Sequence, residues 1–331
     1  MKKQIAMILA FVMVFALCAG GMSASAAADE VKWPNTPVQL VVAYAAGGGT
    51  DLTARTIAEA LGEYGNFAVV NNTDGGGVIG WEQVRTSDPE ICDQLIFALN
   101  SMFITYLSGV SDINPMEDIQ PVFAIDGNLA YFVVVNKDAP YDTLDEMIAY
   151  GKEHPGELTL GAGAPGSTMT VLTSQFIEST GLDCSLVATS GSDADAVAMV
   201  MGGNMSLYLT NQTTTQNYLE AGEIKVLASV LPISEKASEI IRDIPTLEDL
   251  GYKNCTMGTV FIVWAPVGAD EAVYVKINEL FNEALGSEKV QEAFAERGND
   301  YVSFGDLNET IEKLQDAYAD CENAWNSVAQ G

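Results

Sequence analysis

Three consecutive glycines followed by a threonine and an aspartate have the residue types and spacing to bind an anion. The apolar run from Val38 to Tyr44 precedes them and predicts a buried strand, and a helical segment carrying Arg55 follows. A glycine turn that opens a helix presents backbone N–H groups to an anion. We expect Thr50 and Asp51 to cap this helix and Asp51 to pair with Arg55. The residues predicted to contact a ligand are Ala46, Gly47, Gly48, Gly49, Thr50 and Asp51. A plain strand-to-helix turn is the alternative, and both can hold at once.

A second glycine loop, in the middle of the chain, repeats the same order of strand, turn and helix. The strand is expected at 158–161, and the helix is expected to end near Thr180. Glycines allow close backbone approach, hydroxyls offer hydrogen bonds, and the helix start supplies N–H groups. The residues predicted to contact a ligand are Gly163, Ala164, Gly166, Ser167 and Thr168.

This second loop also fits the G-x-G-x-x-G spacing of a dinucleotide site. The fit runs from Gly161 to Gly166, and Asp183 follows at the distance typical of a ribose ligand. The motif alone has low specificity, and Pro165 would restrict the turn. We therefore predict no NAD site and no other cofactor.

Polar residues also follow three other predicted strands, at the carboxyl ends where open α/β sheets bind ligands. These further candidates are Asn100, Ser101, Thr189, Ser190, Gly191, Thr210 and Asn211. Each could equally belong to a satisfied turn. The glycines from Gly75 to Gly77 open a helix too, but Asp74 beside them favours a structural turn.

The residues give little support for catalysis or for a metal site. The single histidine, His154, lies in a His-Pro-Gly turn, so a Ser-His-Asp triad would depend on a surface residue. No G-x-S-x-G occurs, and no pair of carboxylates stands out. Four cysteines follow the leader without metal-ligand spacing, and the choice between one disulfide and four thiols stays open. They are Cys92, Cys184, Cys255 and Cys321. We predict no enzymatic activity and no metal.

The first 28 residues read as a signal peptide. Lys2 and Lys3 precede an apolar core from Ile5 to Ala19, and Ala24-Ser25-Ala26 fits a cleavage site. Lipid attachment at Cys18 is the alternative, and Leu17 before it argues against that. No later apolar run is long enough to cross a membrane. We expect a soluble, exported, periplasmic or extracytoplasmic monomer.

The net charge of the chain is −30, and the leader carries two lysines and no acid, so the mature chain is near −32. Such a charge argues against nucleic acid and against anionic lipid surfaces as partners. A bound anion would be repelled at long range. An anion site must therefore rest on local dipoles and backbone N–H groups.

Strand-like and helical segments alternate along the chain, which predicts an α/β fold. A helix is expected from Asp51 to Glu63, and a crossing between two units near Lys137–Pro140. Two helices are expected near the end, at 270–285 and 307–329. The last should pack onto one of the two units.

Many short segments, in order, resemble the solute-binding proteins of tripartite tricarboxylate transporters, also called Bug proteins. The match covers most of the mature chain, and the order and spacing of the segments make it specific. The segments are Trp33-Pro34-x-x-Pro37, Tyr44 to Asp51, Val70-Asn71-Asn72, Gly75-Gly76-Gly77-x-Ile79-Gly80, Asp118-Ile119-x-Pro121-Val122, Tyr141-x-Thr143-Leu144, His154-Pro155-Gly156-x-Leu158, Gly202-Gly203, Ala221-Gly222-x-Ile224 to Ala228, Ile244 to Glu248 and Ala265-Pro266.

Three places depart from the family pattern. Thr73-Asp74 stands where the family usually has Arg-Pro, and Thr170 stands near a usual histidine. The segment 188–191 replaces a usual Pro-Tyr-Lys-Gly. Positive or polar anchors are therefore missing, which affects the expected ligand class more than the expected fold.

The resemblance implies a two-lobed, venus-flytrap (type II periplasmic-binding-protein) fold with the ligand in a cleft. Lobe 1 would comprise 36–135 and 258–331, and lobe 2 would comprise 136–257. The hinge crossings would fall near 135–137 and 230–258. The acid of the first glycine loop commonly contacts the family ligand, and Asp51 matches it.

The implied function is capture of a small organic acid, such as a di- or tricarboxylate, for delivery to integral membrane permease subunits. The alternatives are an amino-acid binder, a sensor-linked binding protein, and an exported hydrolase. The shortage of histidine and the absence of an identifiable nucleophile argue against the hydrolase.

Overall fold

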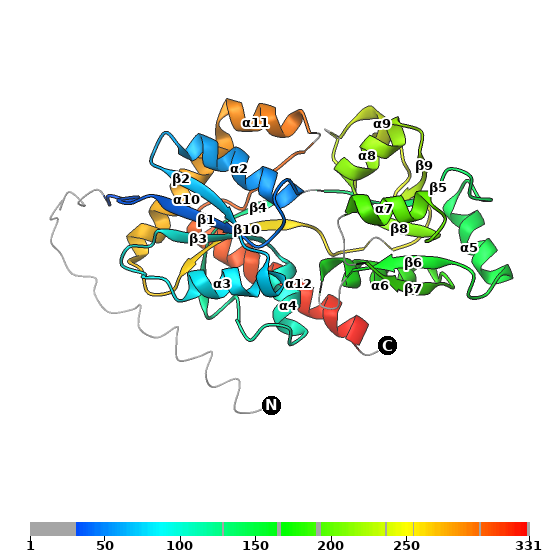
Figure 1. The fold of residues 1–331 in the computed structure, drawn as a ribbon, viewed down its shortest axis with the longest axis horizontal. Helices are drawn as coiled ribbons and strands as arrows, with labels where there is room; N and C mark the ends of the chain where they lie inside the picture. Colours follow the sequence, from blue (N-terminus) through cyan, green and yellow to red (C-terminus); the bar gives the residue numbers. More distant parts are fainter. Residues whose placement is uncertain are drawn as a thin grey trace, which may run out of the picture. The chain divides into compact units, whose positions relative to one another are not determined.

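The computed structural model describes residues 31–127, 129–163, 167–189, 193–235, 237–253, 255–297 and 299–329. The expected signal peptide therefore lies outside the described residues. From Lys32 onward the described chain forms one compact unit. Its strands form two sheets, each with its own helices, which confirms the predicted α/β class (Figure 1).

The first sheet is mixed and has the strand order β11-β4-β10-β3-β1-β2. β1 pairs in parallel with β2 and β3, whereas β10 is antiparallel to both β3 and β4. Four residues of β1 are buried, as expected for a central strand covered on both faces. The strands are β1 (Val38–Val42), β2 (Phe67–Asn71), β3 (Gln94–Leu99), β4 (Ile119–Asp126), β10 (Val260–Pro266) and β11 (Val302–Ser303).

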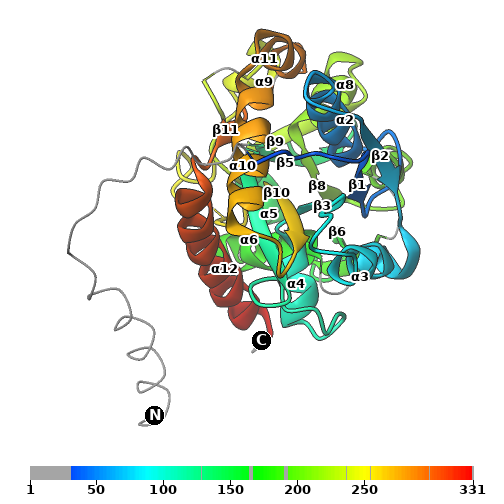
Figure 2. The same cartoon turned by 90° about the vertical axis from the view of Figure 1, so that its left-hand side faces the viewer.

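Helices cover both faces of the first sheet. The chain moves from β1 to β2 in one direction and from β2 to β3 in the other, so right-handed crossovers place α2 and α3 on opposite faces. Figures 1 and 2 show α10 and α11 on the α2 side and α4 on the α3 side. These elements are α2 (Gly49–Leu61), the 3-10 helix η1 (Asp74–Gly77), α3 (Val78–Arg85), α4 (Ser101–Leu107), α10 (Glu271–Gly286) and α11 (Glu288–Ala295).

The second sheet has the order β7-β6-β8-β5-β9. β6 is parallel to β7 and β8, and β5 is antiparallel to β8 and β9. Alternate residues of β5 face different clusters, with Phe132 and Val134 on one side and Val133 and Val135 on the other. The strands are β5 (Tyr131–Asn136), β6 (Thr159–Ala162), β7 (Ser185–Ala188), β8 (Leu207–Asn211) and β9 (Ile224–Ser229).

Three helices of the second sheet begin with a side-chain cap. Thr143 accepts a hydrogen bond from the backbone of Glu146, whose side chain reciprocates in a capping box at the start of α5. Ser167 and Asn211 cap α6 and α8 in a similar way. The helices are α5 (Leu144–Glu153), α6 (Thr168–Thr180), α7 (Asp193–Met201), α8 (Gln212–Glu220) and α9 (Glu239–Arg242).

The C-terminal helix α12 (Leu307–Ala329) contacts elements of both sheets rather than the single unit we expected. It packs against β4 and α4 of the first sheet and against α6 of the second. Tyr318 contacts Phe103 edge to face, with ring centroids 5.3 Å apart. The Cys321 Sγ lies 3.8 Å from the Met257 Sδ, where the chain returns from the second sheet to the first. We call this part of the chain, between β9 and β10, the return crossing. The helix therefore stabilises the return crossing.

Two details differ from the sequence-based expectation, and the open choice between a disulfide and four thiols is decided. β5 belongs to the second sheet, so the first crossing falls between Asp126 and Tyr131, before the segment 135–137. The alternating apolar residues of β5 would fit either sheet. Its pairing with β8 and β9 determines that it belongs to the second sheet. Helix α2 begins at Gly49 with Gly48 as its N-cap, so the prediction that Thr50 and Asp51 cap it was wrong. The cysteines are free thiols. The lobe bounds themselves stay a prediction.

Gly77 offers a test of how closely α3 approaches β1. Its φ of 95° favours glycine, and an added Cβ would lie 2.5 Å from the Ala43 Cβ. Gly76, with φ of 70°, has no atom within 4 Å of such a Cβ. We expect Gly76→Ala to lose roughly 1 kcal/mol of unfolding free energy and Gly77→Ala about 2–3 kcal/mol. Urea unfolding measures both, and equal losses would contradict the close packing.

Candidate functional site

The topology places the predicted ligand loops at one edge of each sheet. A short segment of the chain connects these two edges. β1, β2 and β3 are parallel, so their carboxyl ends share one edge of the first sheet, and the pairing of β10 places the end of β4 there too. In the second sheet the start of β5 shares an edge with the ends of β6, β7 and β8. Only a short connection separates β4 from β5. Carboxyl edges of this kind are where open α/β sheets bind ligands.

The first glycine loop presents unpaired backbone donors at this edge. Residues 45–49 are exposed, and Gly48 is the N-cap of the 13-residue helix α2. The N–H groups of Gly49, Thr50 and Asp51 meet no acceptor among the described residues. The helix dipole adds partial positive charge at the same place. The loop can therefore receive an anion without a charged side chain.

A network centred on the Asp51 carboxylate fixes this loop. Asp51 is 1% exposed. Its Oδ2 accepts hydrogen bonds from the Gly47 N–H at 2.8 Å and the Arg55 Nε at 2.9 Å. Its Oδ1 accepts from the Asn71 Nδ2 at 2.8 Å and pairs with the Arg55 guanidinium at 2.9 Å. Asn71 also donates to the Tyr44 carbonyl at 3.0 Å. We call these five residues the Asp51 network.

The four contacts use the roughly four lone-pair sites that a carboxylate offers. Asp51 thus positions the loop, and its pairing with Arg55 is confirmed. Burial would raise the Asp51 pKa, but hydrogen bonds from Arg55, Gly47 and Asn71 and the Arg55 charge outweigh burial and lower it. We had not predicted Asn71 as a site residue. Its place at the carboxyl end of a predicted strand was the available signal.

The candidates after β3 divide into a structural residue and one at the open edge. Asn100 is 4% exposed, donates to the Gly258 carbonyl at 2.9 Å and accepts from the Val260 N–H at 3.3 Å. These two hydrogen bonds connect the end of the return crossing to the first sheet. Ser101 is partly exposed, and its Oγ lies 2.6 Å from the Tyr44 hydroxyl.

The second glycine loop is described only at its two ends, because Ala164 and Gly166 lie outside the described residues. Gly163 has no room for a side chain, since a Cβ there would lie 2.7 Å from the Met169 Cβ. Ser167 accepts the Thr170 N–H at 3.3 Å as the cap of α6. The Thr168 hydroxyl is buried and has no partner among the described residues.

The loops after β7 and β8 lie along the same edge. Ser190 and Gly191 are outside the described residues, and Thr189 donates to the Ala162 carbonyl at 2.8 Å. Thr210 is 0% exposed, and its hydroxyl finds no partner in the described part of the chain. Asn211 caps α8 by accepting the Thr214 N–H at 3.0 Å. These residues supply hydroxyl and amide groups to the second edge.

Asp193 is a site residue that we had not predicted. It is the first residue of α7, and its carboxylate accepts hydrogen bonds from the Tyr208 hydroxyl at 2.8 Å and from the Asn211 Nδ2. Burial raises the pKa of Asp193. The hydrogen bonds lower the pKa, but the effect of burial is larger. Burial and the Asp193 charge also raise the pKa of Tyr131 to about 12. The sequence placed Asp193 only at a helix start, where an acid is ordinary.

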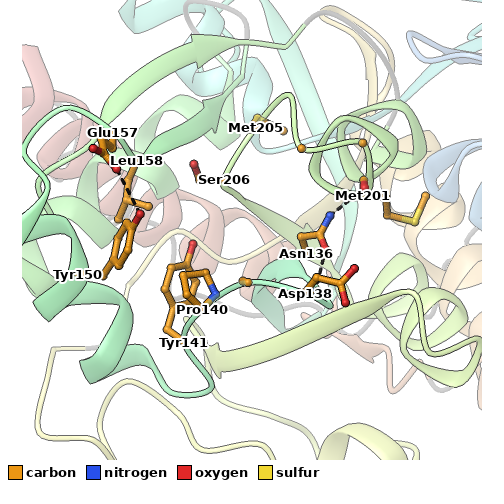
Figure 3. Close-up of a pocket in the computed structure, with 13 residues that line it drawn as sticks. Asn136, Asp138, Pro140, Tyr141, Tyr150, Glu157, Leu158, Met201, Met205 and Ser206 are labelled. Atoms are coloured by element: carbon orange, nitrogen blue, oxygen red, sulfur yellow. Dashed lines mark hydrogen bonds between the residues drawn. The ribbon is translucent and has the colours of Figure 1, made fainter.

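A separate pocket of about 430 Å³ lies at the other edge of the second sheet (Figure 3). Asn136, at the end of β5, and Ser206, just before β8, line it together with Tyr141 and Tyr150. None of the predicted ligand-binding residues lines it.

The described residues offer neither a cluster of metal ligands nor a membrane-spanning helix. No three histidine, cysteine, aspartate or glutamate side chains gather there as metal ligands would. No helix in the same ranges has both the length and the apolar character needed to cross a membrane.

Comparison with known proteins gives consistent matches over most of the chain. BugT of Bordetella pertussis is 32% identical over 295 residues, which are 88% of this chain and 88% of that protein. The structure titled R. palustris Rpa4515 with adipate is 26% identical, with a TM-score of 0.76 over 90% of this chain and 97% of that one. The periplasmic binding protein BugD is 25% identical, with a TM-score of 0.72 over 90% and 98%. The two-lobed fold of periplasmic binding proteins is thereby confirmed.

A family model supplies the remaining comparison. The model described as tripartite tricarboxylate transporter family receptor matches residues 53–322. The match includes the second sheet, every strand of the first sheet except β1, and most of α2 and α12, which is well over half of the chain. The chain therefore belongs to the family of tripartite tricarboxylate transporter receptors, which are solute-binding proteins.

Proposed function

We propose that this protein is exported and captures a small organic acid outside the cytoplasm for delivery to a tripartite tricarboxylate-type membrane transporter. The observation that carries the proposal is the exposed loop 45–49 at the start of α2. The N–H groups of Gly49, Thr50 and Asp51 meet no acceptor there among the described residues, while the Asp51 network holds the backbone. A carboxylate is the anion that such donors suit, and a family relative is described with adipate.

The charge of the chain supports binding by backbone groups rather than by cations. At a net charge of −30 the long-range field repels an anion. The Arg55 guanidinium, which lies nearest the loop, is already bonded to Asp51 and Asn71. The attraction must then be local, from the helix dipole and the N–H groups, and it strengthens when water is excluded.

Closure of the two lobes would exclude that water. The loops of both sheets lie on edges joined by the crossings 127–130 and 230–259. Rotation about such crossings is the usual closing motion of two-lobed binding proteins. In the proposed mechanism the second-sheet loops close over a carboxylate held by the first loop. The membrane permease then recognises the closed form.

Gly49 provides a way to block the loop without disturbing the fold. Nothing lies within 4 Å of a Cβ added there, so Gly49→Leu should fold and project its side chain into the anion position. Gly286 ends α10 and has equally open surroundings, which makes Gly286→Leu a matched control. Calorimetry with adipate, malate, succinate and citrate should show at least about tenfold weaker binding for Gly49→Leu only.

The result that would contradict this site is full binding by Gly49→Leu. Absence of binding by the wild-type mature chain to any carboxylate would instead contradict the proposed function. Thermal unfolding of each variant establishes that it is folded.

The Asp51 network predicts a pH-dependent contribution to stability. Because the folded-state pKa of Asp51 is lowered, its contribution is complete above the unfolded pKa near about 3.9 and is lost as pH falls through the folded value. The difference in unfolding free energy between wild type and Asp51→Asn should therefore be larger at pH 7 than at pH 3. Urea titrations measure it, with Asp74→Asn correcting for the loss of one nearby exposed charge. A difference that does not change with pH would show that Asp51 does not hold the loop as an anion.

A further inference from the structure

The carboxylate of Asp193 lies at the candidate site without a cationic partner. Its two oxygens accept from neutral groups, which are the Tyr208 hydroxyl and the side-chain amide and backbone N–H of Asn211. No lysine, arginine or histidine among the described residues forms an ion pair with it. A carboxylate offers roughly four acceptor sites, so Asp193 can accept one further hydrogen bond. Asp193 therefore retains acceptor capacity that a cationic group of the ligand could use.

Neighbouring residues place Asp193 on the edge that the crossings join to the first sheet. Asn211 is the last residue of β8, at the carboxyl end. The charge of Asp193 acts on Tyr131, whose hydroxyl lies 3.5 Å from the Thr259 Oγ1 on the return crossing. Tyr131 is also influenced by Tyr44, which follows β1 of the first sheet. Asp193 therefore lies near the edge of the second sheet from which the crossings lead to the first sheet.

A second polar group near Asp193 also lacks a partner. Thr210 lies between Tyr208 and Asn211 on β8, and alternation puts its side chain on the same face as Tyr208. It is fully buried, and its hydroxyl has no partner among the described residues. A buried hydroxyl is normally satisfied. An ammonium group of a ligand, which only donates hydrogen bonds, could be accepted by the Thr210 hydroxyl as well as by Asp193.

We propose that Asp193 binds an ammonium group of the ligand, so that the site selects amino carboxylates over amine-free carboxylates of the same length. This rests on the proposed function, because the carboxylate of the ligand is taken to lie at the first glycine loop. An amine-free dicarboxylate would place a second anion against Asp193, whereas an ammonium group would form a charge-assisted hydrogen bond with it. The family departures agree with this, since the lysine of the usual Pro-Tyr-Lys-Gly segment is replaced by Ser190.

Calorimetry on pairs of compounds that differ only by an amine tests the proposal. The pairs are succinate and aspartate, glutarate and glutamate, adipate and 2-aminoadipate, and butyrate and 4-aminobutyrate. In at least one pair the wild-type mature chain should bind the amine-bearing member at least about tenfold tighter, and in no pair should the amine-free member bind tighter. The wild-type ratio alone decides this, whether or not a variant folds.

Asp193→Asn should weaken binding of the preferred amine at least about tenfold and leave binding of its amine-free partner equal or stronger. Asp195→Asn removes the same charge from an exposed position on α7 and should preserve the wild-type ratio. A folded Asp193→Asn protein that keeps the wild-type ratio would overturn the proposal. Equal binding within every pair, or tighter binding of an amine-free member, would overturn it while leaving carboxylate capture intact. Absence of binding to all eight compounds would overturn the proposed function and this inference with it.

Discussion

The buried carboxylate of Asp51 is the constraint on which the first ligand loop depends. It has four contacts, from a loop N–H, from Arg55 and from Asn71. A buried carboxylate is costly unless it is satisfied in this way. Because the network holds Gly47 and the Tyr44 carbonyl, the residues between them and the start of α2 are kept in one conformation. The donors of the loop therefore need little ordering when a ligand arrives.

Sheet topology places this loop at an edge that also carries the other candidate residues of the first sheet. Parallel strands bring their carboxyl ends to one edge in each sheet, and the connection from β4 to β5 joins those edges. Asn100 and α12 then stabilise the return crossing through Gly258, Val260 and Met257. Some residues that resemble ligand contacts in the sequence thus serve the architecture.

Local patterns predicted the elements of the fold better than the roles of single side chains. The apolar run from Val38 and the helical pattern at 270–285 correctly indicate β1 and α10, because strand burial and helical periodicity are set over a few residues. The sheet of β5 depends on partners far along the chain and was misplaced. Asp51 and Asp193 look alike in sequence, each beside glycines at a helix start. Only the structure shows that Arg55 neutralises Asp51 and that neutral donors surround Asp193.

The central claim is that backbone N–H groups of the first loop hold the carboxylate of the ligand. Amide chemical shifts of the ¹⁵N-labelled mature protein, titrated with a carboxylate that binds, test it most directly. The amides of Gly49, Thr50 and Asp51 should move together to the shifts of hydrogen-bonded donors and saturate with the calorimetric affinity. Saturation of the protein with these amides unmoved would contradict the claim and place the carboxylate elsewhere.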